Sequence, residues 1–167
     1  MLTDAQATEV LSEFPPETLG AELLWEAVVD IADREDLGMG PRGSRGIVPI
    51  LGGSFRGGPG MGADLADFHG GIEPGGADRQ LLRPDGAKEL DAFYEMRVAD
   101  GTLLTIRNRV IIDETVDGPR YALSRIEVTA PQGRWDWLNR RLIVGTLQGL
   151  RPRHPAVLIR GWVLKSL

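Results

Sequence analysis

The sequence predicts an all-β fold, a single closed antiparallel barrel of about eight to ten strands. Short runs rich in β-branched and aromatic residues alternate with Gly, Pro and Asp-Gly turn signals, above all between residues 45 and 101. Several of these runs place apolar residues at every second position, as a half-buried strand does. A sheet of this many strands curls or splits to bury one face, and closure into a barrel also removes its exposed edges.

Only the N-terminus has helical spacing. Residues 3–13 combine a capping box of Thr3 and Gln6 with apolar residues three and four apart, and Pro15 and Pro16 end the pattern. We therefore divide the chain into a helical extension, residues 1–20, and a barrel domain, residues 21–167. Because so short a helix is marginal alone in water, we expect it to cap a barrel end, to form an oligomer contact or to cover a pocket mouth as a lid.

The first predicted strand spans residues 22–33 and has one apolar face. That face consists of Leu23, Trp25, Ala27, Val29 and Ile31. Residues 36–46 are rich in turn-forming residues and predict a connection, and residues 47–55 predict the second strand. A glycine-rich loop is expected over 56–77, with at most a short strand near 65–72, followed by a short strand over 78–83.

The clearest hairpin joins residues 87–99 to residues 102–113 through a turn containing Asp100 and Gly101. One face of each arm is apolar except for a single polar residue, Tyr94 in the first arm and Asn108 in the second. Further strands are expected over 121–130, 141–149 and 156–165, and residues 134–139 predict a helical turn. The sheet therefore continues to the C-terminus.

Composition excludes several classes of protein. With 167 residues the chain is long enough for one domain with a real core, and a net charge of −5 argues against non-specific nucleic-acid binding. The absence of cysteine excludes disulfides, thiol catalysis and thiolate metal sites. No apolar run is long enough to span a bilayer, and the acidic N-terminus lacks the features of a secretory signal, so we expect a cytoplasmic protein.

Motifs for metals and cofactors are equally missing from the sequence. The two histidines, His69 and His154, do not have ligand spacing, so we expect no metal site. The run GGPGMG at 57–62 lacks the helix, lysine and hydroxyl that a phosphate loop requires, and no GxSxG elbow occurs. We therefore expect no cofactor.

Seven short pieces occur in a characteristic order: RGIVPILGGSF, PGGADRQ, DG, LDAFYEM, DG, RNR and WLNRRLIVGT. In this order, between about Glu22 and Val163, they resemble the bacterial family called domain of unknown function 3237, or UPF0311. The resemblance implies a single-domain, calycin-like β-barrel that tends to oligomerise, and a family without an assigned general activity. The chain departs from the family pattern at Arg79, where relatives usually carry an aromatic residue, and in a longer loop between Phe55 and Gly75.

Polar residues on the apolar faces are the candidates for chemistry. Tyr94 and Asn108 are either hydrogen-bonded core groups, or a general acid and an oxyanion donor aimed at a ligand. Asp78 either braces the turn after Gly75 and Gly76, or acts as a proton-abstracting base with Gln80 fixing the substrate.

Two further groups are candidate substrate contacts. Arg45 lies among glycines before the second strand and is expected to contact an anionic group. Trp137 and Asn139, in the helical turn, either close one end of the barrel or stack on an aromatic ligand.

Three functions are compatible with these residues. The first is a cofactor-free enzyme of isomerase, dehydratase or lyase type that acts on a small apolar carbonyl or phenolic compound inside the barrel. The second is a non-catalytic carrier of such a small hydrophobic or aromatic ligand, and the third is a structural protein whose barrel is filled by its own side chains. Apolar residues on outer faces, Phe93 and Trp162, predict a homo-oligomer; nucleic acid and membrane are not expected as partners.

Overall fold

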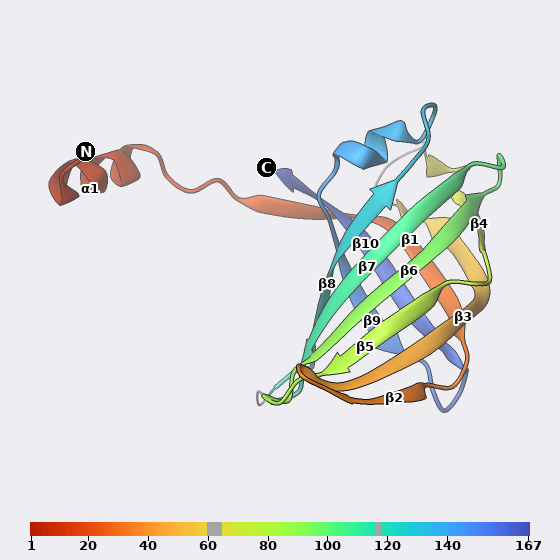
Figure 1. The fold of residues 1–167 in the computed structure, drawn as a ribbon. Coiled ribbons are helices and arrows are strands. Elements are labelled where there is room, and N and C mark those ends of the chain that lie inside the picture. Colours follow the sequence, from red (N-terminus) through yellow and green to blue (C-terminus); the bar gives the residue numbers. More distant parts are fainter. Residues whose placement is uncertain (60–64, 116–117) are drawn as a thin grey trace.

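A computed structural model gives the structure of residues 1–167, of which all but 60–64 and 116–117 are described (Figure 1). Within these described ranges the main elements are one α-helix, ten strands and a 3-10 helix. Their bounds are α1 Asp4–Glu13, β1 Leu19–Ile31, β2 Glu35–Gly40, β3 Gly43–Gly57, β4 His69–Ile72, β5 Ala77–Leu82, β6 Lys88–Val98, β7 Leu103–Asp113, β8 Tyr121–Thr129, η3 Asp136–Arg140, β9 Ile143–Gly149 and β10 Ala156–Ser166. The predicted all-β class with a short N-terminal helix is confirmed.

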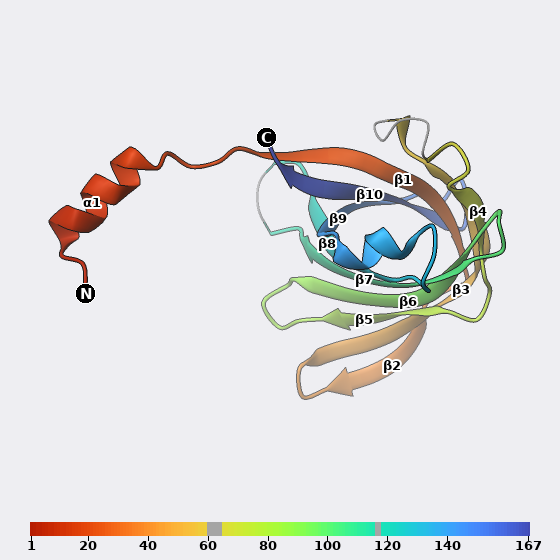
Figure 2. The same ribbon diagram turned by 90° about the horizontal axis from the view of Figure 1, so that it is seen from above.

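The strands form a closed antiparallel barrel. Going round, β1 pairs with β10, followed by β9, β8, β7 and β6; β4 and β5 share the next position, and β3 closes the ring by pairing with β1. That gives eight positions around the barrel, with β2 added as a hairpin arm on β3 alone. Figure 2 looks down the barrel and shows β2 standing outside the ring.

Alternation along the strands decides what faces the lumen. In β6 and β7 the predicted inner faces are confirmed, and Tyr94 and Asn108 are each 2% exposed. The first strand differs from the prediction, because its register shifts between Leu23 and Trp25 where it pairs with β10. This irregularity buries the neighbours Leu24 and Trp25 together, whereas strict alternation would bury only one of them.

The predicted connection over 36–46 is wrong. Residues 35–40 form β2 and residues 43–46 already belong to β3, with only a two-residue turn between the two strands. The reason is that β2 is held by backbone pairing with β3 and buries none of its side chains, so no alternation marks it in the sequence.

Aromatic side chains fill one half of the lumen. Phe68 is fully buried. The centre of its ring lies 4.9 Å from the ring centre of Trp135, 5.3 Å from that of Phe55 and 6.2 Å from that of Trp25. Gly161, on β10, makes room for the Trp25 indole, since a Cβ atom there would lie 2.7 Å from it. Part of the expected loop 56–77 therefore enters the core through Phe68. Its residues 60–64 lie outside the described residues, and these include the second half of the GGPGMG run.

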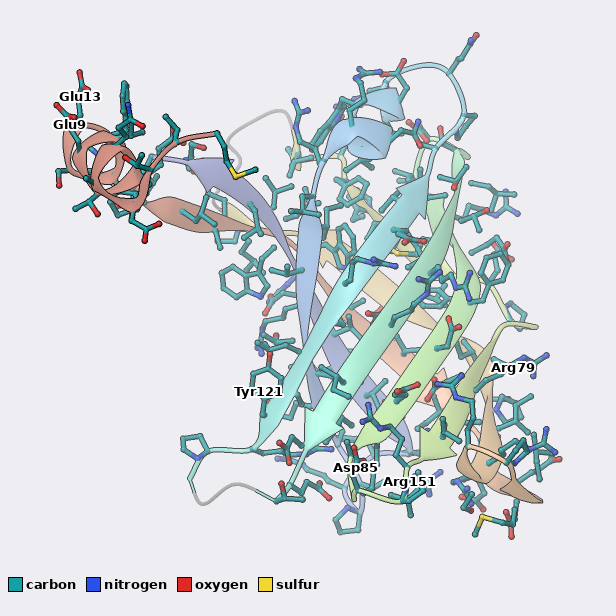
Figure 3. All side chains as sticks on the ribbon, turned by 60° about the vertical axis from the view of Figure 1, so that its left-hand side comes forward. Glu9, Glu13, Arg79, Asp85, Tyr121 and Arg151 are labelled. Atoms are coloured by element: carbon teal, nitrogen blue, oxygen red, sulfur yellow. The ribbon has the colours of Figure 1, made fainter. Side chains whose placement is uncertain are left out.

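The helix α1 stands apart from the barrel. None of its residues is buried, and Figures 1 and 2 show it displaced to one side of the ring. Figure 3 shows Glu9 and Glu13 on this detached helix, while Asp85 and Arg151 mark the barrel end opposite η3. The helix therefore neither caps a barrel end nor covers the cavity mouth within this chain. Within the described residues, no helix has the length and apolar character needed to cross a membrane.

Candidate functional site

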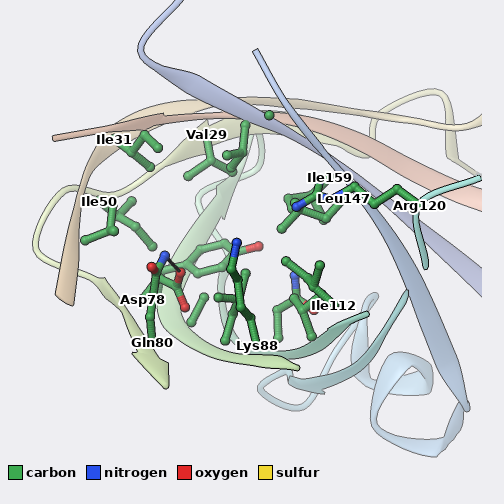
Figure 4. A pocket seen from close by; sticks show the side chains of 18 residues that line it. Val29, Ile31, Ile50, Asp78, Gln80, Lys88, Ile112, Arg120, Leu147 and Ile159 are labelled. Atoms are coloured by element: carbon green, nitrogen blue, oxygen red, sulfur yellow. Dashed lines mark hydrogen bonds between the residues drawn. The ribbon is translucent and has the colours of Figure 1, made fainter. Parts of the chain in front are cut away.

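The half of the lumen away from η3 is hollow. It holds a cavity of about 270 Å³, which Figure 4 shows from close by. Most of the wall is aliphatic and comes from six strands, with Val29 of β1, Ile50 of β3, Leu90 of β6, Ile112 of β7, Leu147 of β9 and Ile159 of β10. A mostly apolar, concave site with a few polar groups is the usual form of a small-molecule site.

Three neighbouring strands bring the predicted polar residues into this cavity. Asp78 of β5 pairs in register with Ala92 of β6, which in turn pairs with Asn108 of β7. Strands lie about 4.8 Å apart, so the Cα atoms of Asp78 and Asn108 are separated by about 10 Å. The small Ala92 between them leaves that space open, and Tyr94 follows two residues later on the same face of β6. Asp78, Gln80, Tyr94 and Asn108 all line the cavity.

Asp78 is oriented by its neighbour on β5. Its Oδ2 atom accepts a hydrogen bond of 2.8 Å from Gln80 Nε2. Its Oδ1 atom is closed off from solvent and has no hydrogen-bond partner in the described structure. Burial raises the pKa of the Asp78 carboxyl, and the Gln80 hydrogen bond offsets part of that rise. One oxygen is therefore fixed by Gln80 while the other is buried and unpartnered, on a carboxyl that is more basic than usual.

Tyr94 and Asn108 carry the other unpartnered polar atoms of the cavity wall. Neither the Tyr94 hydroxyl nor Asn108 Oδ1 finds a partner among the described residues, although both atoms are buried. Burial raises the pKa of the Tyr94 phenol, so that the phenol is neutral at physiological pH and can donate a hydrogen bond. Buried polar groups usually find partners, and three unpartnered atoms in one cavity point to a ligand that supplies them.

Two cations, which the sequence analysis did not single out, line the mouth of the cavity. Lys88 Nζ lies 3.1 Å from Glu114 Oε2, and Arg120 Nε lies 3.1 Å from Glu114 Oε1. The Lys88 hydrogen bond is the largest cause that lowers the pKa of Glu114, with Arg120 adding to it. Lys88 could have been found from the sequence, because it continues the alternation of Leu90, Ala92 and Tyr94. Arg120 lies just before β8 and carries no such signal.

The structure does not bring Arg45, Trp137 or Asn139, the other predicted substrate contacts, into the lining of this cavity. Arg45 is exposed on the hairpin of β2 and β3, where its Nη2 atom donates 3.2 Å to the Leu37 carbonyl. Trp137 lies in η3 against the aromatic core, with the Arg141 guanidinium 5.6 Å from its ring centre.

The side chain of Asn139 attaches η3 to the backbone of Ala130, the residue that follows β8. Its Oδ1 atom accepts 2.8 Å from the Ala130 amide, and its Nδ2 atom donates 2.9 Å to the Ala130 carbonyl. Trp135, at the start of η3, is tied to the turn between β6 and β7 by a 2.8 Å bond from its Nε1 atom to Asp100 Oδ2. These contacts close the end of the barrel that the cavity does not reach.

No group of three or more His, Cys, Asp or Glu side chains within the described ranges is arranged to hold a metal ion. The polar residues of the cavity are one carboxylate, two amides, a phenol and two cations at the mouth. Such a set suits hydrogen bonding and proton transfer to an organic molecule.

Comparison with known proteins gives relatives with the same barrel. A UPF0311 protein of Rhodopseudomonas palustris is 32% identical over 143 residues, which cover 77% of this chain and 88% of that protein. A UPF0311 protein of Clostridium acetobutylicum is 37% identical over 78 residues, or 45% of this chain and 44% of that protein.

Solved structures agree at the level of the fold. A crystal structure of a conserved protein of unknown function from Rhodopseudomonas palustris superposes with a TM-score of 0.74 at 28% identity, covering 90% of this chain and all of that one. A β-barrel-like protein from Acinetobacter baumannii gives 0.73 at 26% identity over 91% of this chain and 99% of that one. An enzyme from Penicillium herquei gives 0.68 at 18% identity over 91% of this chain and 98% of that one, a likeness of fold alone.

The family model for the protein of unknown function DUF3237 matches residues 20–164, which is the barrel from the beginning of β1 to near the end of β10. The expected resemblance is thereby confirmed, and the chain belongs to the DUF3237 family.

Proposed function

We propose that this protein is a cofactor-free enzyme that transfers protons on a small apolar carbonyl or phenolic compound bound inside the barrel. The observation that supports it most is the gathering of three buried, unpartnered polar atoms around one apolar cavity: Asp78 Oδ1, Tyr94 Oη and Asn108 Oδ1. Apolar walls bind the body of such a compound, and the polar atoms meet its oxygen and its acidic C–H or O–H group.

Asp78 is the proposed base. Desolvation raises its pKa, and a carboxylate that is poorly solvated accepts a proton more readily than one in water. Gln80 holds one carboxylate oxygen, so the other is presented in a fixed direction. In the first step the carbon next to the substrate carbonyl loses its proton to Asp78 Oδ1, and the C–H electron pair forms an enolate.

Tyr94 and Asn108 are the proposed partners of the enolate oxygen. The neutral Tyr94 phenol and the Nδ2 group of Asn108 are the donors to the enolate oxygen, whereas Asn108 Oδ1 can only accept a hydrogen bond, from a hydroxyl group of the compound. Returning the proton from Asp78 to another carbon gives isomerisation. Expelling hydroxide, with Tyr94 as the acid, gives dehydration. In carbon–carbon cleavage Asp78 instead takes the proton of a hydroxyl group on the next carbon, that oxygen becomes a carbonyl, and the electron pair of the broken C–C bond forms the enolate.

Deuterium exchange tests formation of the enolate, the first step of the isomerisation and dehydration routes, without knowledge of the natural substrate. The ketone 1-tetralone has acidic hydrogens beside its carbonyl, and their exchange in D₂O can be followed by proton NMR. We expect the protein to accelerate exchange and the Asp78→Asn variant to lose about a hundredfold or more of that acceleration. Glu127→Gln, an amide substitution on the outer face, is the matched control and should keep the full rate.

Equal rates in the parent protein and Asp78→Asn would contradict the proposal. Saturable binding of 1-tetralone without any exchange would instead identify a carrier.

A further inference from the structure

The mouth of the cavity carries positive charge that proton transfer does not require. Lys88 and Arg120 both line the cavity, and Figure 4 shows their side chains reaching into it from different sides. Glu114 forms an ion pair with each of these two cations and is not among the residues that line the cavity. Two positive charges against one negative charge leave this trio with a net charge of +1.

Lys88 and Arg120 are placed so that both bind the same carboxylate group. Each holds a different oxygen of Glu114, Oε2 for Lys88 and Oε1 for Arg120, both at 3.1 Å. The side chains of all three are between 42% and 48% exposed, and ion pairs with this exposure are weak. An incoming carboxylate can therefore take the place of Glu114 at little cost, with the same charge-assisted hydrogen bonds.

The mouth lies at a defined distance from the proposed reaction centre. Lys88 and Ala92 are four residues apart on the inner face of β6, which is about 13 Å along a strand. Ala92 lies in the row of Asp78 and Asn108. A molecule that reaches from this row to the mouth has an apolar body about the size of two fused rings.

We propose that the cavity takes an amphiphilic organic carboxylate, with its apolar ring system among the aliphatic walls and its carboxylate held by Lys88 and Arg120 in place of Glu114. This names the substrate class of the same site and so depends on the proposed function. Glu114 acts as an intramolecular competitor that occupies the two cations when no ligand is bound.

A matched pair of ligands tests the inference. Naphthalene-2-carboxylate and naphthalene-2-carboxamide share ring and shape and differ in charge, and their affinities are measured by isothermal titration calorimetry. We expect the carboxylate to bind about tenfold more tightly, as charge-assisted hydrogen bonds exceed neutral ones. The double variant Lys88→Gln/Arg120→Gln should bind both ligands equally. Glu114→Gln should bind the carboxylate more tightly than the parent protein does.

The control removes the same charge elsewhere. Arg97 and Lys165 pair with Glu73 and Glu22, and Arg97→Gln/Lys165→Gln should keep the preference for the carboxylate. Near-ultraviolet circular dichroism verifies that every variant keeps its packed aromatic core.

Equal binding of the two ligands by the parent protein would overturn the inference and leave the proposed chemistry standing. A preference for the carboxylate that remains in Lys88→Gln/Arg120→Gln would also overturn the inference. So would weaker binding of the carboxylate by Glu114→Gln than by the parent protein. If neither ligand binds, the inference fails, and the exchange of 1-tetralone decides separately on the proposed function.

Discussion

Burial of Asp78 destabilises its charged form in the folded protein and makes the same carboxylate a stronger base. An ionised carboxylate in this position has one oxygen bonded to Gln80 and one without a partner among the described residues. Burial disfavours the charged form, which is why the pKa of Asp78 is raised. A carboxyl that is costly to ionise in the folded protein is at the same time a better base toward a bound molecule.

The raised pKa has a definite effect on stability. Because the folded pKa of Asp78 lies above its unfolded value of about 3.9, the native state binds more protons between the two values, and stability falls as pH rises through that window. Asparagine has the same shape and does not titrate. We expect Asp78→Asn to gain stability over the parent protein as pH rises from 4 to 7.5, measured as the free energy of unfolding in urea.

The control for this measurement is Glu127→Gln, which removes a carboxylate paired with Arg125 on the outer face. Its free energy of unfolding should stay within about 0.5 kcal/mol of the parent value at each pH. A difference between Asp78→Asn and the parent protein that does not change with pH would mean that the Asp78 carboxyl titrates normally.

At the scale of elements, the hairpin of β6 and β7 shows what the sequence can predict. Its alternation is local, so the two inner faces, the turn and the inward positions of Tyr94 and Asn108 all follow from residues close together in the chain. Asp78 and Gln80 reach the same cavity because β5 is short and regular and pairs with β6.

What the sequence did not predict depends on pairing that no alternation of apolar and polar residues marks. The strand β2 is visible only through its partner β3, and the register shift in β1 only through β10. Asn139 looked like a ligand contact, but its partner is the Ala130 backbone nine residues earlier. No local pattern shows which amide will meet which backbone group.

The room for a ligand depends on one small side chain between two polar ones. Ala92 separates Asp78 from Asn108 across the sheet, and a larger residue there would extend into the cavity. We expect Ala92→Leu to weaken binding of naphthalene-2-carboxylate more than about tenfold. The variant should be at least as stable as the parent protein, because the added carbon atoms fill open apolar space at about 0.8 kcal/mol for each buried CH₂ group. Calorimetry and urea unfolding give the two values.

The same substitution at an exposed strand position, Ala21→Leu on β1, is the control and should leave binding unchanged. Full affinity in Ala92→Leu would place the ligand outside the row of Asp78 and Asn108.

At the scale of the whole molecule, one end of the barrel is packed with side chains and the other end contains the cavity. One is closed by η3 and the aromatic cluster of Trp25, Phe55, Phe68 and Trp135, and the other opens beside the turn between β5 and β6 (Figures 1 and 3). The packed half supports the cavity, because the strands that carry Tyr94 and Asn108 continue directly into the aromatic core. A site on such strands is held more firmly than one on loops.

The outer wall supports the prediction of a homo-oligomer. Phe93, on the outer face of β6, is 54% exposed and lies in a surface hollow with Arg79, Arg107, Asp91 and Glu95. An apolar residue surrounded by charges of both signs can pair with a second copy of itself around a two-fold axis. We expect a mass of twice 18.2 kDa in sedimentation equilibrium.

A substitution at this surface tests whether Phe93 is needed for dimerisation in a protein that still folds. Phe93→Ser should give a folded protein of 18.2 kDa, because Phe93 contributes to the outer wall and not to the core. Leu51→Ser, at an equally exposed apolar position on β3, should keep the mass of the parent protein. If the parent protein sediments as a monomer at tens of micromolar, the exposed Phe93 does not form a contact between copies. The cavity would then be unaffected, since Asp78, Tyr94, Asn108, Lys88 and Arg120 all come from a single chain.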